Sequence, residues 1–278
     1  MQGASHKRVD KECQDSFKKL EFDDGTIIIA VADGHGSAAC PYSKSGSNIA
    51  VNVFCKIMDE YRISYAGNLD MLLTYLNREG DTKVAQGVDA EWKRRVLKVH
   101  TNQKREVPLT EDGEKDKEEI YKQYGSTLVG LMITPVFIFA FQLGDGDISY
   151  VDKNGLSRLL NDDKILGVET HSLSKADSWK KAVSAVQRRD AGIGLPYMLM
   201  LSTDGFANSY KNADEFGKTC EDYFNMIQQH GAEAVAANLK GWLSETSSMG
   251  CGDDITVLIA YFSDDAGPES ETDANERI

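Results

Sequence analysis

The sequence predicts an α+β fold with largely antiparallel β-sheets. Strand-like and helical segments occur in blocks along the chain, which favours this class over a doubly wound parallel fold, where strands and helices alternate. The chain has 278 residues, of which 41% are hydrophobic, so it can bury a substantial core. No linker-like stretch divides residues 1–262, and we therefore expect them to form one domain.

Six segments predict β-strands, because they are rich in Val, Ile, Phe and Tyr and are bounded by Gly, Asp or Pro. In chain order they are Thr26–Ala32, Ser126–Ile133, Val136–Leu143, Asp147–Val151, Tyr197–Ser202 and Ile255–Phe262. A hairpin turn is expected at Asn154-Gly155, since both residues tolerate a positive φ.

Helical patterns fill two zones. The first runs from about Ser43 to Tyr124 and predicts three or four helices, the last within the charged stretch Glu111–Lys122. The second predicts helices over Asp214–His230 and Ala232–Ser244. Residues 263–278 are polar, lack aromatic side chains and are rich in Asp, Glu, Ser and Gly. That composition predicts an acidic, disordered tail.

Composition excludes several classes of partner. The formal net charge of −13 argues against nonspecific nucleic-acid binding, which needs a basic surface. The five cysteines form no CxxC pair, which is typical of reduced thiols in a cytosolic protein. No basic and apolar leader follows Met1, and the longest apolar run, Val129–Leu143, is too short to span a bilayer. We therefore expect a cytoplasmic protein without nucleic-acid or membrane partners.

Aspartates recur where predicted strands begin or end, and several of them precede a glycine. They are Asp15, Asp33, Asp145, Asp204 and the adjacent pair Asp253 and Asp254. A single aspartate of this kind is usually a turn former, because its carboxylate bonds to the nearby backbone. Several placed alike indicate a site for hard divalent cations, since Mg²⁺ and Mn²⁺ prefer oxygen ligands. A following glycine also leaves room for a backbone carbonyl to approach the cation.

Six short motifs occur between about Gly3 and Phe262. They are Cys-Gln-Asp-Ser, Val-Ala-Asp-Gly-His-Gly, Tyr-Gly-Ser-Thr, Leu-Gly-Asp-Gly, Leu-Ser-Thr-Asp-Gly and Asp-Asp-Ile-Thr-Val. In this order they resemble the motifs of the protein phosphatase 2C family, whose members are metal-dependent Ser/Thr phosphatases. The Cys-Gln-Asp variant and Glu169-Thr170 are most similar to the bacterial branch. The resemblance implies a four-layer α-β-β-α sandwich, in which helices flank two mostly antiparallel β-sheets.

The resemblance also implies a site for two divalent cations, Mn²⁺ or Mg²⁺. Asp33 would bridge both ions, with the carbonyl of Gly34 on one of them. Asp204 and Asp253 would bind the other ion, and Asp253 rather than Asp254 matches the family's ligand position. Asp15 would hold a water on the metal or complete the shell of the second ion. Asp145, together with Asp204, corresponds to a weaker third site found in some members.

The implied reaction is hydrolysis of a phosphate ester. A water that bridges the two ions is acidified and attacks phosphorus in line. His35 is the implied general acid for the Ser or Thr leaving group, and the alternative is an ordinary turn histidine. Ser126-Thr127 would support the site from a strand start, and Asp162–Leu195 corresponds to the family's mobile flap.

The expected contact with the substrate phosphate departs from the family pattern. Many members carry an arginine where this chain has Asp10. Arg8 is our candidate for the contact, because a guanidinium matches the geometry of a phosphate; the alternative is a solvated surface arginine. Gln14 replaces the glutamate that the family carries before Asp15, which keeps hydrogen bonding but removes one charge.

Three functions follow from these observations. The first is a cytosolic, Mn²⁺- or Mg²⁺-dependent protein Ser/Thr phosphatase, with a phosphoprotein substrate and a cognate Ser/Thr kinase as partners. The second is a catalytically weak regulatory or phosphoprotein-binding module, which the changes at Asp10 and Gln14 favour. The retention of four residues opposes it, namely Asp33, His35, Asp204 and Asp253. The third, a phosphoesterase for small molecules, has no recognisable nucleotide or sugar pocket in its favour.

Overall fold

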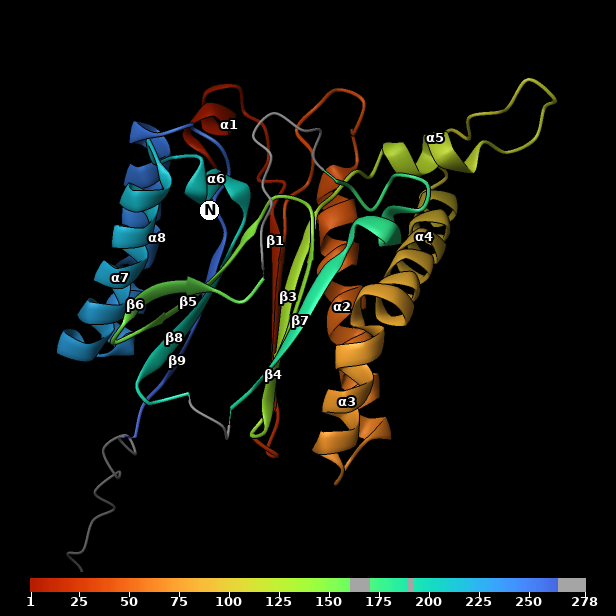
Figure 1. The fold of residues 1–278 in the computed structure, drawn as a ribbon. Helices are drawn as coiled ribbons and strands as arrows, with labels where there is room; N and C mark the ends of the chain where they lie inside the picture. Colours follow the sequence, from red (N-terminus) through yellow and green to blue (C-terminus); the bar gives the residue numbers. More distant parts are fainter. Residues whose placement is uncertain (161–170, 190–192, 265–278) are drawn as a thin grey trace, which may run out of the picture.

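The computed structural model describes residues 1–160, 171–189 and 193–264. The fold has four layers, in which two β-sheets lie face to face and each is covered on its outer side by helices (Figure 1). The predicted α+β class and the four-layer sandwich of antiparallel sheets are both confirmed.

One sheet has five strands, and every neighbouring pair in it is antiparallel. Its strands, in spatial order, are β1 (Ser16–Glu21), β2 (Ile27–Ala32), β3 (Leu128–Ile133), β4 (Phe137–Leu143) and β7 (Val183–Arg188). The central strands β3 and β4 are buried along their whole length. Helices cover one face and the second sheet covers the other, so these strands are apolar at successive positions rather than at alternate ones, apart from Gly130 and the buried Gln142.

The other sheet has four strands, also antiparallel. Their spatial order is β6 (Gly155–Arg158), β5 (Asp147–Asp152), β8 (Tyr197–Ser202) and β9 (Val257–Phe262). Strands β5 and β6 pair from Asp152 and Gly155 onward. The expected hairpin is therefore present, but its turn is Lys153-Asn154, one residue earlier than predicted, and Gly155, with a φ of 100°, begins β6.

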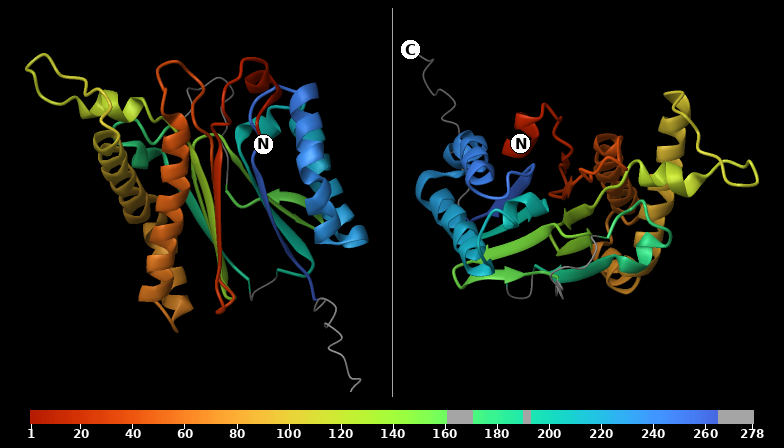
Figure 2. Two further views of the ribbon diagram at one scale, coloured as in Figure 1. Left: turned by 180° about the vertical axis from the view of Figure 1, so that it is seen from behind. Right: turned by 90° about the horizontal axis from the view of Figure 1, so that it is seen from above.

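Helices form the two outer layers (Figure 2). The five-stranded sheet is covered by α2 (Ser43–Ser64), α3 (Leu69–Glu79) and α4 (Ala85–Asn102), with the short α5 (Lys117–Lys122) at one end. The four-stranded sheet is covered by α7 (Ala213–His230) and α8 (Ala232–Met249). Two short helices, α1 (Ala4–Arg8) and α6 (Asp204–Ala207), lie beside α8.

Three apolar layers hold the sandwich together. The layer between α2–α4 and the five-stranded sheet includes the fully buried Trp92 and Phe54. A second layer lies between the sheets and includes Leu131 and Leu199. The third, which includes Phe206, lies between the four-stranded sheet and α7 and α8. Burial of large side chains in each layer fixes the sheets relative to the helices, because each side chain contributes about 1.5–3 kcal/mol when it leaves water.

Two strands were not expected, β1 and β7, and both are edge strands of the five-stranded sheet. Edge strands are only partly buried, so polar residues interrupt their apolar pattern. β7 lies within the stretch Asp162–Leu195 that the family resemblance identifies as a flap. Residues 161–170 and 190–192 of that stretch lie outside the described residues.

The charged stretch Glu111–Lys122 is helical only from Lys117 onward. Residues 110–114 instead form a turn, closed by a hydrogen bond of 2.8 Å from the Thr110 amide to the Glu114 carbonyl. Residues 265–278, most of the predicted tail, lie outside the described residues. In the part of the chain that is described, no helix has both the length and the apolar character needed to cross a membrane.

Candidate active site

Five of the aspartates that the motifs single out meet at one edge of the sandwich. Antiparallel pairing sets this edge: β2, β4 and β8 end there, and β1, β5 and β9 begin there. The loops and strand ends at this edge carry Asp15, Asp33, Asp145, Asp204 and Asp253.

The charges of these carboxyl groups act on one another. Burial raises the pKa of Asp33 well above its usual value, and the charges of Asp15, Asp204 and Asp253 raise it further. Burial also raises the pKa of Asp204 to about 7, with added contributions from Asp145, Asp253 and Asp15. The pKa of Asp15 is raised to about 6, chiefly by burial. The side chains therefore face a common space, in which their negative charges repel one another.

This arrangement suits divalent cations. The hydroxyl of Thr203 donates to Asp15 Oδ2 at 2.7 Å, whereas the buried Asp15 Oδ1 has no donor among the described residues. Among those residues, no three His, Cys, Asp or Glu side chains have the spacing to enclose one ion. Mg²⁺ is commonly held by one or two carboxylates and keeps several waters, so an open set of carboxylates fits it. A bound cation would also relieve the repulsion that raises these pKa values.

Asp253 and Asp254 lie in different surroundings. The side chain of Asp253 is 48% exposed, and its Oδ1 accepts a hydrogen bond of 2.8 Å from the Asp254 amide. Asp254 is only 2% exposed. Both of its oxygens are bonded to the N-terminal segment, through the amides of Gly3 and Gln14 at 2.6 and 2.7 Å. Asp253 is thus the member of the pair that is open to the site.

His35 belongs to the same loop as Asp33. Its amide donates to the carbonyl of Gly125 at 3.0 Å. A Cβ atom on Gly125 would overlap the His35 ring, so this close approach requires glycine. Burial lowers the pKa of His35, the charge of Lys175 lowers it further, and Asp145 opposes the shift. The His35 ring is therefore close enough to both Asp145 and Lys175 for their charges to act on it.

Ser126-Thr127 hold the Asp33 loop against the start of β3, where the sequence predicts a supporting pair. The Asp33 amide donates to Thr127 Oγ1 at 3.0 Å, and the Thr127 amide donates to the Asp33 carbonyl at 2.9 Å. The carbonyl of Ser126 accepts from the Leu173 amide at 2.9 Å. This last bond attaches the segment that carries Lys175 to the same place.

Two cations from the N-terminal segment are relevant to phosphate binding. Arg8 is the last residue of α1, and its side chain is exposed. Lys11 was not singled out by the sequence, yet its Nζ donates to the carbonyl of Gly36 at 2.6 Å, one residue after His35. The sequence feature that could have pointed to Lys11 is its place directly after Asp10, the position where many family members carry arginine.

Comparisons with known proteins agree with this fold and motif order. The protein phosphatase 2C family model matches residues 2–244. A bacterial serine phosphatase has a similar structure, with 12% identity, a TM-score of 0.59, and coverage of 92% of this chain and 94% of that one.

Two further solved structures are similar. The S. agalactiae serine/threonine phosphatase gives 16% identity, a TM-score of 0.54, and coverage of 91% and 93%. The catalytic domain of the serine/threonine protein phosphatase PstP, solved with two manganese ions, gives 14% identity, a TM-score of 0.54, and the same coverage of the two chains, 91% and 93%. No curated protein sequence matches the chain. Because this family model spans most of the chain, the chain belongs to the protein phosphatase 2C family.

Proposed function

We propose that this protein is a phosphoprotein phosphatase that hydrolyses phosphoserine and phosphothreonine with the help of two Mn²⁺ or Mg²⁺ ions. The observation that carries the proposal is the group of mutually repelling carboxylates around Asp33, with His35 in the same loop. Such a group suits cations, and the histidine beside it can transfer a proton.

The cations would be held by Asp33, the carbonyl of Gly34, Asp204 and Asp253, with Asp15 completing the set. Asp145 would contribute to a weaker third position. When bound, the cations would supply an acidified water as nucleophile and neutralise charge on the phosphoryl oxygens. The PstP structure, with its two manganese ions, supports this choice of metal and number.

His35 is the proposed general acid. A Ser or Thr alkoxide is a poor leaving group, so its oxygen needs a proton as the bond to phosphorus breaks. The bond from the His35 amide to Gly125 and the tight fit against that residue fix the ring's position. Burial lowers the pKa of His35, which eases release of its proton, and the charge of Asp145 opposes that shift.

Lys11 and Arg8 are the proposed contacts for the substrate phosphate. The bond from Lys11 to the Gly36 carbonyl places an ammonium group beside the loop that carries Asp33 and His35. Arg8 offers a guanidinium on the same segment, at the end of α1.

The proposed partners are a phosphoprotein and the Ser/Thr kinase that phosphorylates it, in the cytoplasm. The five cysteines are all free thiols, which is compatible with a reducing compartment.

The proposal is tested with a phosphothreonine peptide and Mn²⁺, with and without EDTA. We expect hydrolysis that EDTA abolishes and that Asp33→Asn lowers by about 1,000-fold or more, since several kcal/mol of transition-state stabilisation depend on the cations. Asp222→Asn, at an exposed position of α7, is the matched control and should keep full activity. Hydrolysis that survives EDTA or Asp33→Asn would contradict the proposal.

A second candidate is a regulatory module that binds phosphoproteins without turning them over. Two observations favour it: Asp10 stands where the family carries arginine, and Gln14 replaces a glutamate and bonds through Nε2 to Ser43 at 2.6 Å. Tight binding of the phosphopeptide without hydrolysis in Mn²⁺ would support this candidate.

A further inference from the structure

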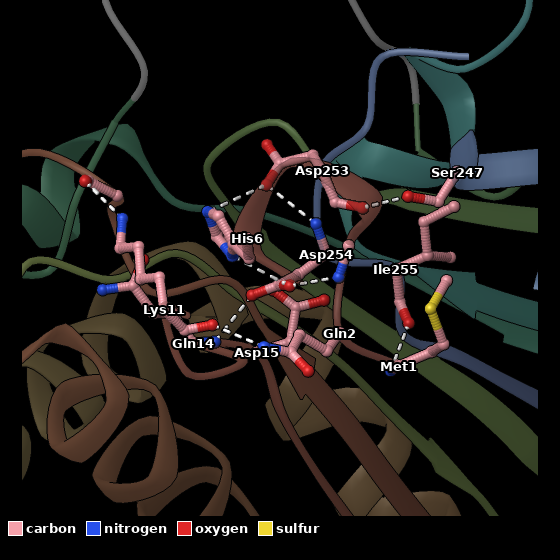
Figure 3. Close-up of polar contacts among 12 residues, drawn as sticks. Met1, Gln2, His6, Lys11, Gln14, Asp15, Ser247, Asp253, Asp254 and Ile255 are labelled. Carbon is pink, nitrogen blue, oxygen red and sulfur yellow. Dashed lines mark hydrogen bonds and ion pairs between the residues drawn. The ribbon is translucent and has the colours of Figure 1, made fainter. Parts of the chain in front are cut away.

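The N-terminal arm, residues 1–15, lies along the loop that leads into β9. Met1 and Ile255 exchange two hydrogen bonds, of 2.7 Å from the Met1 nitrogen and 3.0 Å from the Ile255 amide. The Ser5 amide donates to the Gly252 carbonyl at 2.8 Å. Figure 3 shows the arm and this loop meeting around Asp254, with Asp15 on one side and Asp253 on the other.

Asp254 joins the two chain segments. Its Oδ1 accepts from the Gly3 amide at 2.6 Å, and its Oδ2 accepts from the Gln14 amide at 2.7 Å. Gln14 precedes Asp15, and Asp254 follows Asp253. One buried carboxylate therefore connects the backbones of two aspartates that we propose as cation ligands.

His6 lies against this carboxylate. Its Nδ1 lies 2.9 Å from Asp254 Oδ1, and its Nε2 lies 3.9 Å from Asp253 Oδ1. The His6 side chain is 14% exposed. A buried carboxylate is costly without polar neighbours, so the ring of His6 and the amides of Gly3 and Gln14 together form the polar surroundings of Asp254.

Gly3 sets how closely the arm approaches the site. A Cβ atom there would overlap the backbone of Asp253 and the carbonyl of Gly252. The arm is therefore in direct contact with the peptide that carries Asp253. A methyl group at Gly3 would force the arm and the loop apart, because neither side of the contact is the flexible end of a side chain.

We propose that the His6–Asp254 pair and the close contact at Gly3 position Asp15 and Asp253 relative to each other, so that the N-terminal arm sets the cation affinity of the site. His6 and Asp254 act as positioning residues. Partners that orient metal ligands from outside typically change metal affinity by 10- to 100-fold. This inference rests on the proposed function, in which these aspartates hold cations.

The test measures Mn²⁺ binding to the full chain without substrate, by the loss of the free Mn²⁺ signal in electron paramagnetic resonance. We expect His6→Ala and Gly3→Ala to weaken binding by about 10-fold or more. His6→Gln, which keeps a polar side chain against Asp254, should retain more affinity than His6→Ala. The matched controls are His230→Ala, at an exposed position, and Gly241→Ala, where a Cβ meets no atom within 4 Å; both should bind as the wild type does.

A double-mutant cycle separates positioning from general destabilisation. In an Asp254→Asn background the contact between His6 and the carboxylate is already lost, so adding His6→Ala should weaken Mn²⁺ binding by less than about 3-fold. Mn²⁺ binding by every variant is measured at a temperature below the midpoint of its thermal unfolding in EDTA. If the wild type binds Mn²⁺ and His6→Ala binds equally well, the arm has no such role and the proposed function stands. If the wild type binds no Mn²⁺, both proposals fail.

Discussion

Thr203 donates a hydrogen bond of 2.7 Å from its hydroxyl to Asp15 Oδ2, across 188 positions of sequence. The hydroxyl oxygen of Thr203 in turn accepts from the amide of Thr256 at 3.0 Å. One buried hydroxyl thus connects the start of β1, in the five-stranded sheet, with the end of β8 and the start of β9 in the other sheet. This connection holds the two sheets together at the edge where the aspartates meet.

Thr203→Val should destabilise the protein by about 1–3 kcal/mol. The substitution keeps the shape of the side chain but leaves a buried carboxylate oxygen and the Thr256 amide without their partner. Urea unfolding in EDTA gives the free energy of unfolding. Thr101→Val, at an exposed position of α4, is the control and should change it by less than about 0.5 kcal/mol. Equal stability of the Thr203 variant and the wild type would contradict this interpretation.

Without divalent cations, the stability of the protein should fall as the pH rises from 5 to 7.5. The pKa values of Asp15 and Asp204 are about 6 and about 7 in the folded chain, against 3.8 for an ordinary aspartate. The folded state therefore holds protons that the unfolded state has lost. Each such group lowers stability by about 1.4 kcal/mol per pH unit until the pH reaches its folded pKa, about 6 for Asp15 and about 7 for Asp204. His35, whose pKa is lowered by burial, acts in the opposite direction.

Asp204→Asn isolates the carboxylate contribution to this pH dependence. In EDTA the variant should be more stable than the wild type at pH 7.5 and should lose less stability between pH 5 and 7.5. Mn²⁺ should stabilise the wild type more than the variant, because a ligand that binds the folded state raises its stability. Unfolding midpoints in EDTA and in Mn²⁺ measure both effects, and an equal pH slope for both proteins would rule out Asp204 as the source.

His35→Ala should slow hydrolysis of a phosphothreonine peptide by about 100-fold or more, the usual size of a general-acid contribution. The loss should be much smaller for p-nitrophenyl phosphate, whose leaving group needs little protonation. Steady-state rates on the two substrates give the comparison, with His230→Ala as the control. Equal losses on both substrates would show that His35 is not the acid.

Lys11→Ala and Arg8→Ala distinguish the two candidate contacts for the phosphate. If the ammonium beside Gly36 binds the phosphate, Lys11→Ala should raise KM by about 10-fold or more, because a hydrogen bond from a charged donor contributes about 1.5–3 kcal/mol. Lys11→Arg should restore part of the loss, and Arg8→Ala should leave KM within about 2-fold. A larger effect at Arg8 would assign the contact to the guanidinium.

The interior strands and the edge strand β9 were predicted from the sequence, whereas the edge strands β1 and β7 were not. β4 is apolar except for Gln142, because both of its faces are covered, and that pattern is local. β1 alternates exposed and more buried residues and carries two lysines, so only its pairing with β2 makes it a strand. β1 and β7 depend on a neighbour that the local sequence does not reveal.

The class of the fold and the aspartates that meet at one edge could be predicted from the sequence, because each aspartate stands where an apolar strand begins or ends. The contacts that hold these aspartates in place could be seen only in the folded structure. The bonds from Asp254 to Gly3 and Gln14 and the contact of His6 with Asp254 join residues about 240 to 250 positions apart. Such contacts arise from the packing of the sheets and leave no periodic pattern along the chain. The carboxylates could therefore be found in the sequence, whereas the residues that position them could not.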